Sequence, residues 1–95
     1  MQKRCVIGAR SWGSALALSL HKNNHQVFMW TRDVDQVEEI RDTKENSKFL
    51  PGVIFPDDLI VSNDLEEVIK DSEIVVLAVP SQAVRSVSKQ IKPFI

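Results

Sequence analysis

Residues 5–13 have the sequence CVIGARSWG, in which a short apolar run leads into a glycine turn. The run Cys5–Ile7 is apolar and partly β-branched, as expected of a buried strand that ends at Gly8. The segment from Ser11 to Asn24 is rich in alanine and leucine, which predicts a helix with apolar neighbours on more than one side. The chain is therefore expected to begin with a buried strand, a glycine turn and a helix.

Strand and helix patterns alternate along the rest of the chain. Apolar segments predict three further strands, at Gln26–Trp30, Leu59–Val61 and Ile74–Val79. Helical patterns occur in three further segments, at Val34 to about Thr43, around Leu65–Ile69, and over Ala83–Ile91. This alternation calls for a parallel sheet with right-handed crossovers. We therefore predict an α/β fold, a partial Rossmann-like doubly wound parallel sheet of about four strands with helices on both faces.

Capping and breaking residues set the expected ends of the helices. Asp33, Asp64 and Ser81 each precede a helical pattern and suit its N-cap. Pro93 is expected to close the last helix. Two prolines and a glycine predict that residues 44–58 form no regular element.

The longest apolar run is the six-residue segment Ile74–Val79. Its unbroken apolarity predicts a strand with both faces covered, and it is far short of the ~20 residues needed to span a bilayer. A net charge of −1 gives no bulk attraction to nucleic acid or to an anionic membrane, and 43% hydrophobic residues exclude a disordered chain. The single cysteine, Cys5, cannot form an internal disulfide, so we expect a reduced, cytoplasmic protein.

The turn after the first strand resembles a dinucleotide-binding fingerprint, G-x-G-x-x-G, with one departure. Gly8 permits the tight turn, Gly13 lets the helix lie close to the strand, and Arg10 replaces the glycine that lets the backbone approach the pyrophosphate. We expect Arg10 to weaken dinucleotide binding, because a left-handed conformation there would cost about 1–2 kcal/mol. Alternatively, its guanidinium swings outward and pairs with a phosphate, or the turn merely joins the strand to the helix.

The end of the second predicted strand offers groups for the adenosine ribose. Asp33 lies twenty residues after Gly13, where dinucleotide folds place an acidic residue on the ribose 2′-hydroxyl. Thr31 and Arg32 suit a 2′-phosphate instead, and Asp33 then serves only as the helix N-cap. The cofactor is therefore expected to be NADP or NAD, and the arginine favours NADP.

Several motifs occur in a characteristic order along the chain. They are Val6-Ile7-Gly8-Ala9, Ser11-Trp12-Gly13, Ala15-Leu16-Ala17, Val27-Phe28-Met29-Trp30 with Arg32, Leu50-Pro51-Gly52, Asp64-Leu65-Glu66-Glu67 and Ala78-Val79-Pro80-Ser81-Gln82. Together they resemble the N-terminal part of the bacterial-type NAD(P)-dependent glycerol-3-phosphate dehydrogenase family, over essentially the whole chain.

The resemblance implies an enzyme that interconverts dihydroxyacetone phosphate and sn-glycerol 3-phosphate and feeds phospholipid synthesis. By position, Ser11 and Trp12 would contact the cofactor from the turn Gly8–Gly13, the phosphate turn of the family, and Arg32 would contact the adenosine ribose. The bend at Val79-Pro80-Ser81 would lie beside the nicotinamide half of the cofactor.

Residues 1–95 are accordingly expected to be an N-terminal cofactor-binding domain of a longer enzyme. The family's catalytic lysine and its C-terminal substrate domain would lie beyond Ile95, so we expect no turnover from this chain alone. The main alternative is a non-catalytic nucleotide-binding or self-associating module, a homodimer or domain swap formed through an uncovered sheet edge. A different dehydrogenase with a similar first half is a third possibility, which the Ser-Trp-Gly and Leu-Pro-Gly motifs disfavour.

The remaining chemistry-bearing residues are interpreted as structural. His21 and His25 flank the end of the first helix, where positive charge suits the helix dipole. Cys5 is expected to be a small core residue and Trp30 to pack on the sheet, while Trp12 packs at the helix start unless it contacts the cofactor. No cluster of cysteine and histidine residues in the sequence suggests a metal.

Overall fold

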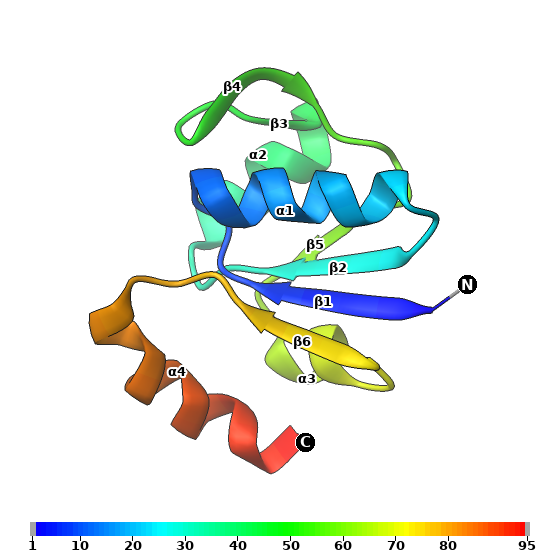
Figure 1. Ribbon diagram of the computed structural model, residues 1–95. Helices are drawn as coiled ribbons and strands as arrows, with labels where there is room; N and C mark the ends of the chain where they lie inside the picture. Colours follow the sequence, from blue (N-terminus) through cyan, green and yellow to red (C-terminus); the bar gives the residue numbers. More distant parts are fainter. Residues whose placement is uncertain (1, 95) are drawn as a thin grey trace.

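Four parallel strands form the central sheet, in the order β5-β2-β1-β6. The computed structural model describes residues 2–94, and its sheet strands are β1 (Lys3–Ile7), β2 (Gln26–Trp30), β5 (Ile60–Ser62) and β6 (Ile74–Leu77) (Figure 1). The chain adds β2 and β5 on one side of β1 and then returns to place β6 on the other side. The carboxyl ends of β1 and β6 therefore mark the point where the strand order reverses, which is where doubly wound sheets bind ligands.

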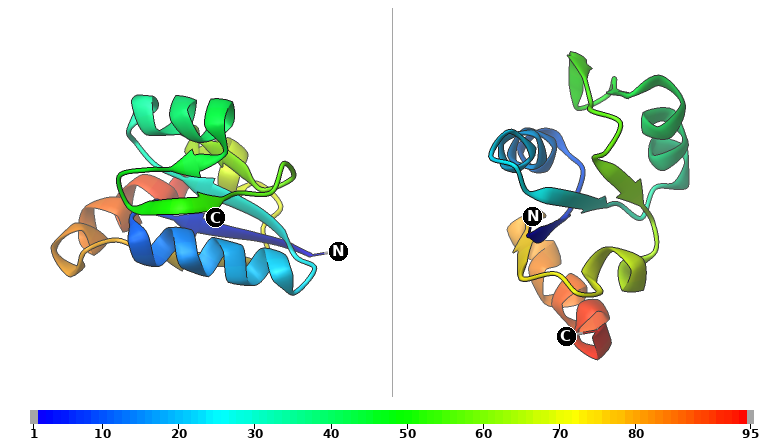
Figure 2. Two further views of the ribbon diagram at one scale, coloured as in Figure 1. Left: turned by 90° about the horizontal axis from the view of Figure 1, so that it is seen from above. Right: turned by 90° about the vertical axis from the view of Figure 1, so that its right-hand side faces the viewer.

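Helices cover both faces of this sheet. They are α1 (Ser11–Lys22), α2 (Val34–Thr43), α3 (Leu65–Ile69) and α4 (Val84–Ile91), with short 3-10 turns η1 (Ser81–Ala83) and η2 (Lys92–Phe94). Figure 2 shows α1 and α2 on one face of the sheet and α3 and α4 on the other. The predicted α/β fold, a four-stranded Rossmann-like parallel sheet flanked by helices, is confirmed.

Alternating side chains of the central strands supply two separate cores. On the α1 and α2 face, Val6 of β1 packs with Val27 and Met29 of β2. On the α3 and α4 face, Cys5 and Ile7 of β1 pack with other side chains, among them Trp30, Val68, Val87 and Ile91. Successive residues of a strand point to opposite faces of the sheet, so each of these short strands contributes side chains to both cores.

Residues 44–58 are not irregular, as the sequence predicted, because a two-stranded antiparallel hairpin forms there. Its strands are β3 (Glu45–Asn46) and β4 (Leu50–Ile54). Pro51 and Gly52 lie inside β4, but the strand pairs only through Leu50 and Ile54, so the hairpin needs no hydrogen bond from the proline. Leu50 and Val53 pack against the core under α1, and this burial holds the hairpin in place.

β6 is shorter and more open than its sequence predicted. It ends at Leu77, so Ala78 and Val79 lie outside the sheet. The expectation that both faces of this strand are covered is met only in part, because Val75 and Leu77 pack against the core but none of its four residues is fully buried. Among the described residues, β6 lies at the edge of the sheet and pairs with β1. Ile74 is 47% exposed, and the other three residues of β6 are only half-buried.

The helix caps agree with the sequence at two of three positions. Asp33 accepts hydrogen bonds from the backbone of Asp35 and Gln36, and Asp64 does the same at the start of α3. The prediction that Ser81 caps the last helix is wrong, because it lies inside η1 and makes no capping hydrogen bond. Pro93 does not close α4 directly, since α4 ends at Ile91 and Pro93 lies within η2.

Candidate functional site

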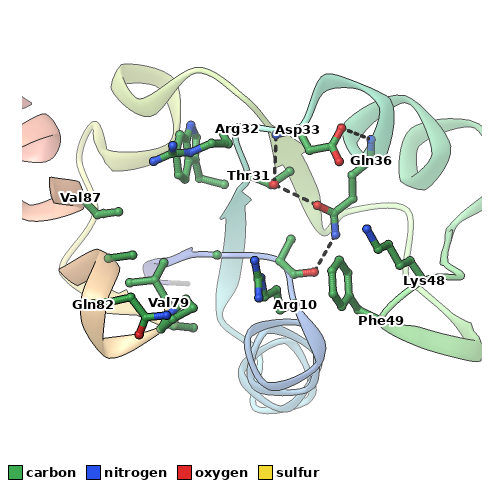
Figure 3. Close-up of a pocket in the computed structure, with 16 residues that line it drawn as sticks. Arg10, Thr31, Arg32, Asp33, Gln36, Lys48, Phe49, Val79, Gln82 and Val87 are labelled. Atoms are coloured by element: carbon green, nitrogen blue, oxygen red, sulfur yellow. Dashed lines mark hydrogen bonds between the residues drawn. The ribbon is translucent and has the colours of Figure 1, made fainter.

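A pocket of about 410 Å³ opens at the carboxyl ends of β1, β2 and β6, where the strand order reverses. Four parts of the chain form its walls: the turn after β1, the end of β2 with the start of α2, the hairpin, and the segment after β6 (Figure 3). Its lining residues are Gly8, Ala9, Arg10, Trp30, Thr31, Arg32, Asp33, Gln36, Lys48, Phe49, Ala78, Val79, Pro80, Gln82, Ala83 and Val87.

The turn between β1 and α1 is possible only with glycine at both of its ends. Gly8 has a φ of +121°, and a Cβ there would lie 2.3 Å from the carbonyl oxygen of Ala78. A Cβ on Gly13 would lie 2.2 Å from the carbonyl oxygen of Gly8. The structural tasks that the sequence assigned to these two glycines are confirmed: a tight turn, and close contact between helix and strand.

Arg10, at the place of the middle glycine, adopts an ordinary extended backbone. Its φ of −78° and ψ of −175° require no left-handed conformation, so the strain considered from the sequence does not arise. Its side chain is exposed at the pocket, with the guanidinium carbon 5.8 Å from the centre of the Phe49 ring. Lys48 lies near the same ring, with Nζ 5.3 Å from its centre. Two cations therefore stand beside Phe49 at this wall.

The end of β2 contributes three consecutive residues to the pocket. Thr31 is buried, and its hydroxyl donates to Gln36 Oε1 at 2.9 Å and accepts from the backbone N–H of Asp33 at 3.3 Å. Arg32 is exposed at the pocket wall. Asp33 caps α2 through Oδ1, which accepts from Asp35 and Gln36 at 3.0 and 3.3 Å. The capping role of Asp33 is thus confirmed, and the residue is exposed at the pocket.

Some of the predicted cofactor-binding residues lie outside the pocket lining. Val79 and Pro80 line it, whereas Ser81, Ser11, Trp12 and Gly13 do not. Ser11 lies at the first turn of α1, where its hydroxyl donates to the carbonyl oxygen of Phe49 at 2.6 Å. Trp12 is 65% exposed, so the alternative of an ordinary core aromatic is wrong, while Trp30, only 6% exposed, is a core residue as predicted.

Besides Trp30, four polar or aromatic lining residues were not among the predicted site residues: Gln36, Lys48, Phe49 and Gln82. Lys48 and Phe49 belong to the hairpin, which the sequence suggested was irregular. The motif Leu50-Pro51-Gly52, noted in the sequence, directly follows them and was the available signal. Gln36 carries no motif of its own, and only the tertiary fold brings it to the pocket.

Other candidate residues lie away from this pocket. His21 Nε2 lies 2.6 Å from Asp58 Oδ1, a carboxylate contact that sequence spacing did not reveal. This hydrogen bond holds the pKa of Asp58 below its ordinary value. Cys5 is fully buried, and desolvation raises the pKa of its thiol, which agrees with a core role. Within residues 2–94 no group of acidic, histidine or cysteine side chains is arranged to hold a metal, and no helix is long and apolar enough to cross a membrane.

Comparison with known proteins shows which family this chain matches. Residues 3–95 match the family model described as NAD-dependent glycerol-3-phosphate dehydrogenase N-terminus. The glycerol-3-phosphate dehydrogenase [NAD(P)+] of Fusobacterium nucleatum is 44% identical over all 95 residues, which cover 28% of that protein. The same-named protein of a Thermoanaerobacter species is 47% identical over 90 residues, or 95% of this chain and 27% of that protein.

Solved structures agree with this assignment. The crystal structure of glycerol-3-phosphate dehydrogenase from Coxiella burnetii superposes with a TM-score of 0.93 at 33% identity. The match covers 99% of this chain and 29% of that one. The chain thus spans little more than a quarter of the length of such relatives. This chain belongs to the family described as NAD-dependent glycerol-3-phosphate dehydrogenase N-terminus.

Proposed function

We propose that this chain binds a nicotinamide dinucleotide, NADP or NAD, and is the N-terminal cofactor-binding domain of a glycerol-3-phosphate dehydrogenase. The observation that carries the proposal is the turn Gly8–Gly13, which brings the N-terminus of α1 to the pocket at the switch point of the sheet. The first N–H groups of a helix have no partner within it, and together with the helix dipole they favour an anion such as a pyrophosphate.

The pocket offers complementary groups for the rest of such a cofactor. Arg32 is proposed to meet the 2′-phosphate of NADP, since it is exposed at the end of β2. Asp33 suits the 2′-hydroxyl of NAD through the oxygen that does not cap α2. Arginine beside aspartate leaves both cofactors possible, and the arginine favours NADP.

The turn and the segment after β6 complete the proposed site. Ser11 and Trp12 are proposed to contact the cofactor from the first turn of α1, where Trp12 is mostly exposed. Val79, Pro80 and Ser81 are proposed to lie beside the nicotinamide half, because the chain leaves the sheet there at the pocket wall. Arg10 is compatible with a bound pyrophosphate, since its backbone is unstrained and its side chain stands beside Phe49.

In the complete enzyme, a reduced nicotinamide would give a hydride to the carbonyl carbon of dihydroxyacetone phosphate, whose oxygen takes up a proton, and an oxidised nicotinamide would accept the hydride in the reverse reaction. The residues described here would bind and orient that cofactor. We propose that this chain has no turnover by itself, and that the enzyme is cytoplasmic and feeds phospholipid synthesis. If the purified chain oxidised the cofactor in a reaction that depends on dihydroxyacetone phosphate, the expectation of no turnover would be contradicted.

A self-associating module is favoured by a separate observation. The edge strand β6 exposes Ile74, and Val84 of α4 and Phe94 of η2 are also exposed, at 37% and 39%. Unpaired strand edges and exposed apolar side chains favour pairing with another chain. We propose a homodimer or a domain swap through this edge, which is compatible with cofactor binding.

The location of the cofactor is tested by titrating the ¹⁵N-labelled chain with NADPH and recording amide shifts. We expect the largest shifts at the phosphate turn, the end of β2 and the segment after β6. His21 and Asp58, which lie outside the pocket, serve as internal controls. Shifts confined to residues outside the pocket would contradict the proposed site.

A further inference from the structure

The carbonyl oxygen of Ala9, inside the phosphate turn, accepts three side-chain hydrogen bonds. The donors are Gln36 Nε2 at 2.7 Å, Asn46 Nδ2 at 2.7 Å and Ser14 Oγ at 3.2 Å. Asn46 and Ser14 are fully buried, and Ala9 is 3% exposed. A carbonyl oxygen has two lone pairs, so these donors use its whole accepting capacity. They come from α1, α2 and the hairpin, three elements that meet at this atom.

Each polar atom of the Gln36 and Asn46 side-chain amides has a defined role as donor or acceptor around this oxygen. The second hydrogen of Gln36 Nε2 goes to Asn46 Oδ1 at 3.1 Å, and the second hydrogen of Asn46 Nδ2 goes to Ser14 Oγ at 3.0 Å. Gln36 Oε1 accepts from the hydroxyl of Thr31 at 2.9 Å. Both amides therefore use every hydrogen they have, and neither can rotate without losing several hydrogen bonds.

This arrangement fixes the peptide that joins Ala9 to Arg10. A trans peptide is planar, with its C=O and N–H on opposite sides, and the described residues contain no cis peptide bond. Gln36, on α2, donates to the Ala9 carbonyl oxygen, a hydrogen bond drawn as a dashed line from Gln36 in Figure 3. The N–H of Arg10, across the same trans peptide, therefore points away from Gln36. Hydrogen bonds to the carbonyl also polarise the peptide, which makes that N–H a stronger donor.

We propose that Gln36 and Asn46 are positioning residues that aim the Arg10 N–H at the pyrophosphate of a bound dinucleotide. The proposal rests on the proposed function and adds to it the residues that set the phosphate donor. Asn46 lies on β3, so the hairpin acts on pyrophosphate binding through the backbone of the turn. Neither side chain needs to touch the cofactor for this role.

The test compares Gln36→Met, which keeps the length of the side chain and removes its hydrogen bonds, with Gln90→Met as a matched control. Gln90 is exposed on α4, outside the pocket, and its side-chain amide donates to the hydroxyl of Ser86 at 3.4 Å. Each protein is titrated with NADPH, which has a pyrophosphate, and with adenosine 2′-monophosphate, which has none. The amide resonance of Arg10 is recorded in the free proteins.

We expect Gln36→Met to weaken NADPH binding about tenfold, the effect of a misaligned hydrogen bond to a charged group. Binding of adenosine 2′-monophosphate should change less than about twofold, and Gln90→Met should change neither ligand. The Arg10 amide proton should move upfield in Gln36→Met and stay unchanged in Gln90→Met, because only the first variant makes the Ala9–Arg10 peptide less polarised. Ser14→Ala, which removes a smaller donor, is the second variant and should weaken NADPH binding about threefold.

The proposal would be overturned if Gln36→Met bound NADPH as tightly as the unmodified chain does. It would also be overturned if Gln36→Met lost affinity for NADPH and for adenosine 2′-monophosphate equally, because a merely structural role gives that result. If the unmodified chain binds neither ligand, the proposed function fails as well. That outcome differs from failure of the positioning role, in which the unmodified chain binds and the variants bind equally well.

Discussion

At the scale of single residues, the turn Gly8–Gly13 depends on atoms that approach each other too closely for any side chain. Gly8 combines a positive φ with a carbonyl oxygen of Ala78 directly at the place of a Cβ. Gly52 also has a positive φ, +80°, but a Cβ there would meet nothing within 4 Å. The two glycines therefore separate the cost of backbone conformation from the cost of a steric clash.

Substitution of each glycine by alanine should show this difference. Gly52→Ala is expected to lower the free energy of unfolding by about 1–2 kcal/mol, the cost of a left-handed conformation. Gly8→Ala adds a clash with backbone, so its loss should exceed that of Gly52→Ala by about 2 kcal/mol. Urea denaturation measures both, and equal losses would show that the turn relaxes around the new methyl group.

Arg10→Gly tests whether the arginine blocks the phosphate turn. Because the backbone of Arg10 is extended and its side chain lies beside Phe49, we expect the dissociation constant for NADPH to change less than about threefold. Calorimetric titration of both proteins gives the comparison. A glycine variant that binds NADPH more than about tenfold tighter would mean that the arginine does obstruct the pyrophosphate.

At the scale of elements, the hairpin shows what sequence patterns could not predict. Pro51 and Gly52 are breaking residues by local rules, and they form a strand here because Leu50 and Val53 are held against α1. Since the hairpin was not predicted, its contributions to the pocket were not predicted either. The turn Gly8–Gly13 and the end of β2 were predicted as candidate binding segments because strand, glycine and spacing are local signals.

The same limit applies to β6 and to the contacts of the first helix. The apolar run Ile74–Val79 correctly predicted a strand but not its place at the sheet edge, because strand order is a property of the whole fold. The contact between His21 and Asp58 joins residues that lie far apart in sequence, so no spacing rule could reveal it.

The pair of His21 and Asp58 ties the end of α1 to the segment before β5, and we expect it to be pH-dependent. The hydrogen bond from His21 lowers the pKa of Asp58 in the folded chain. A lowered carboxyl pKa gives stability that is present above the unfolded pKa and is lost as the pH falls through the folded one. In His21→Gln, carbon NMR titration should show the Asp58 pKa closer to its ordinary 3.8. An unchanged pKa would show that the contact is absent in solution.

At the scale of the whole domain, helices lie on both faces of the sheet, and within residues 2–94 no second strand pairs with β6 at the edge of the sheet. Ile74→Lys places a charge on this edge, and Val34→Lys is a control at a similarly exposed position on α2. We expect the unmodified chain and Val34→Lys to sediment as dimers, and Ile74→Lys to sediment as a monomer. A monomeric unmodified chain at high concentration would contradict association through this edge.

The central claim is that the turn from β1 into α1 makes this chain a dinucleotide-binding domain. Calorimetric titration of the purified chain with NADPH, and separately with NADH, tests it most directly. The structure predicts saturable binding of about one dinucleotide per chain, with the stronger affinity for NADPH because Arg32 stands at the end of β2. No heat of binding from a folded chain with either dinucleotide would contradict the claim and leave the family's fold without its cofactor site.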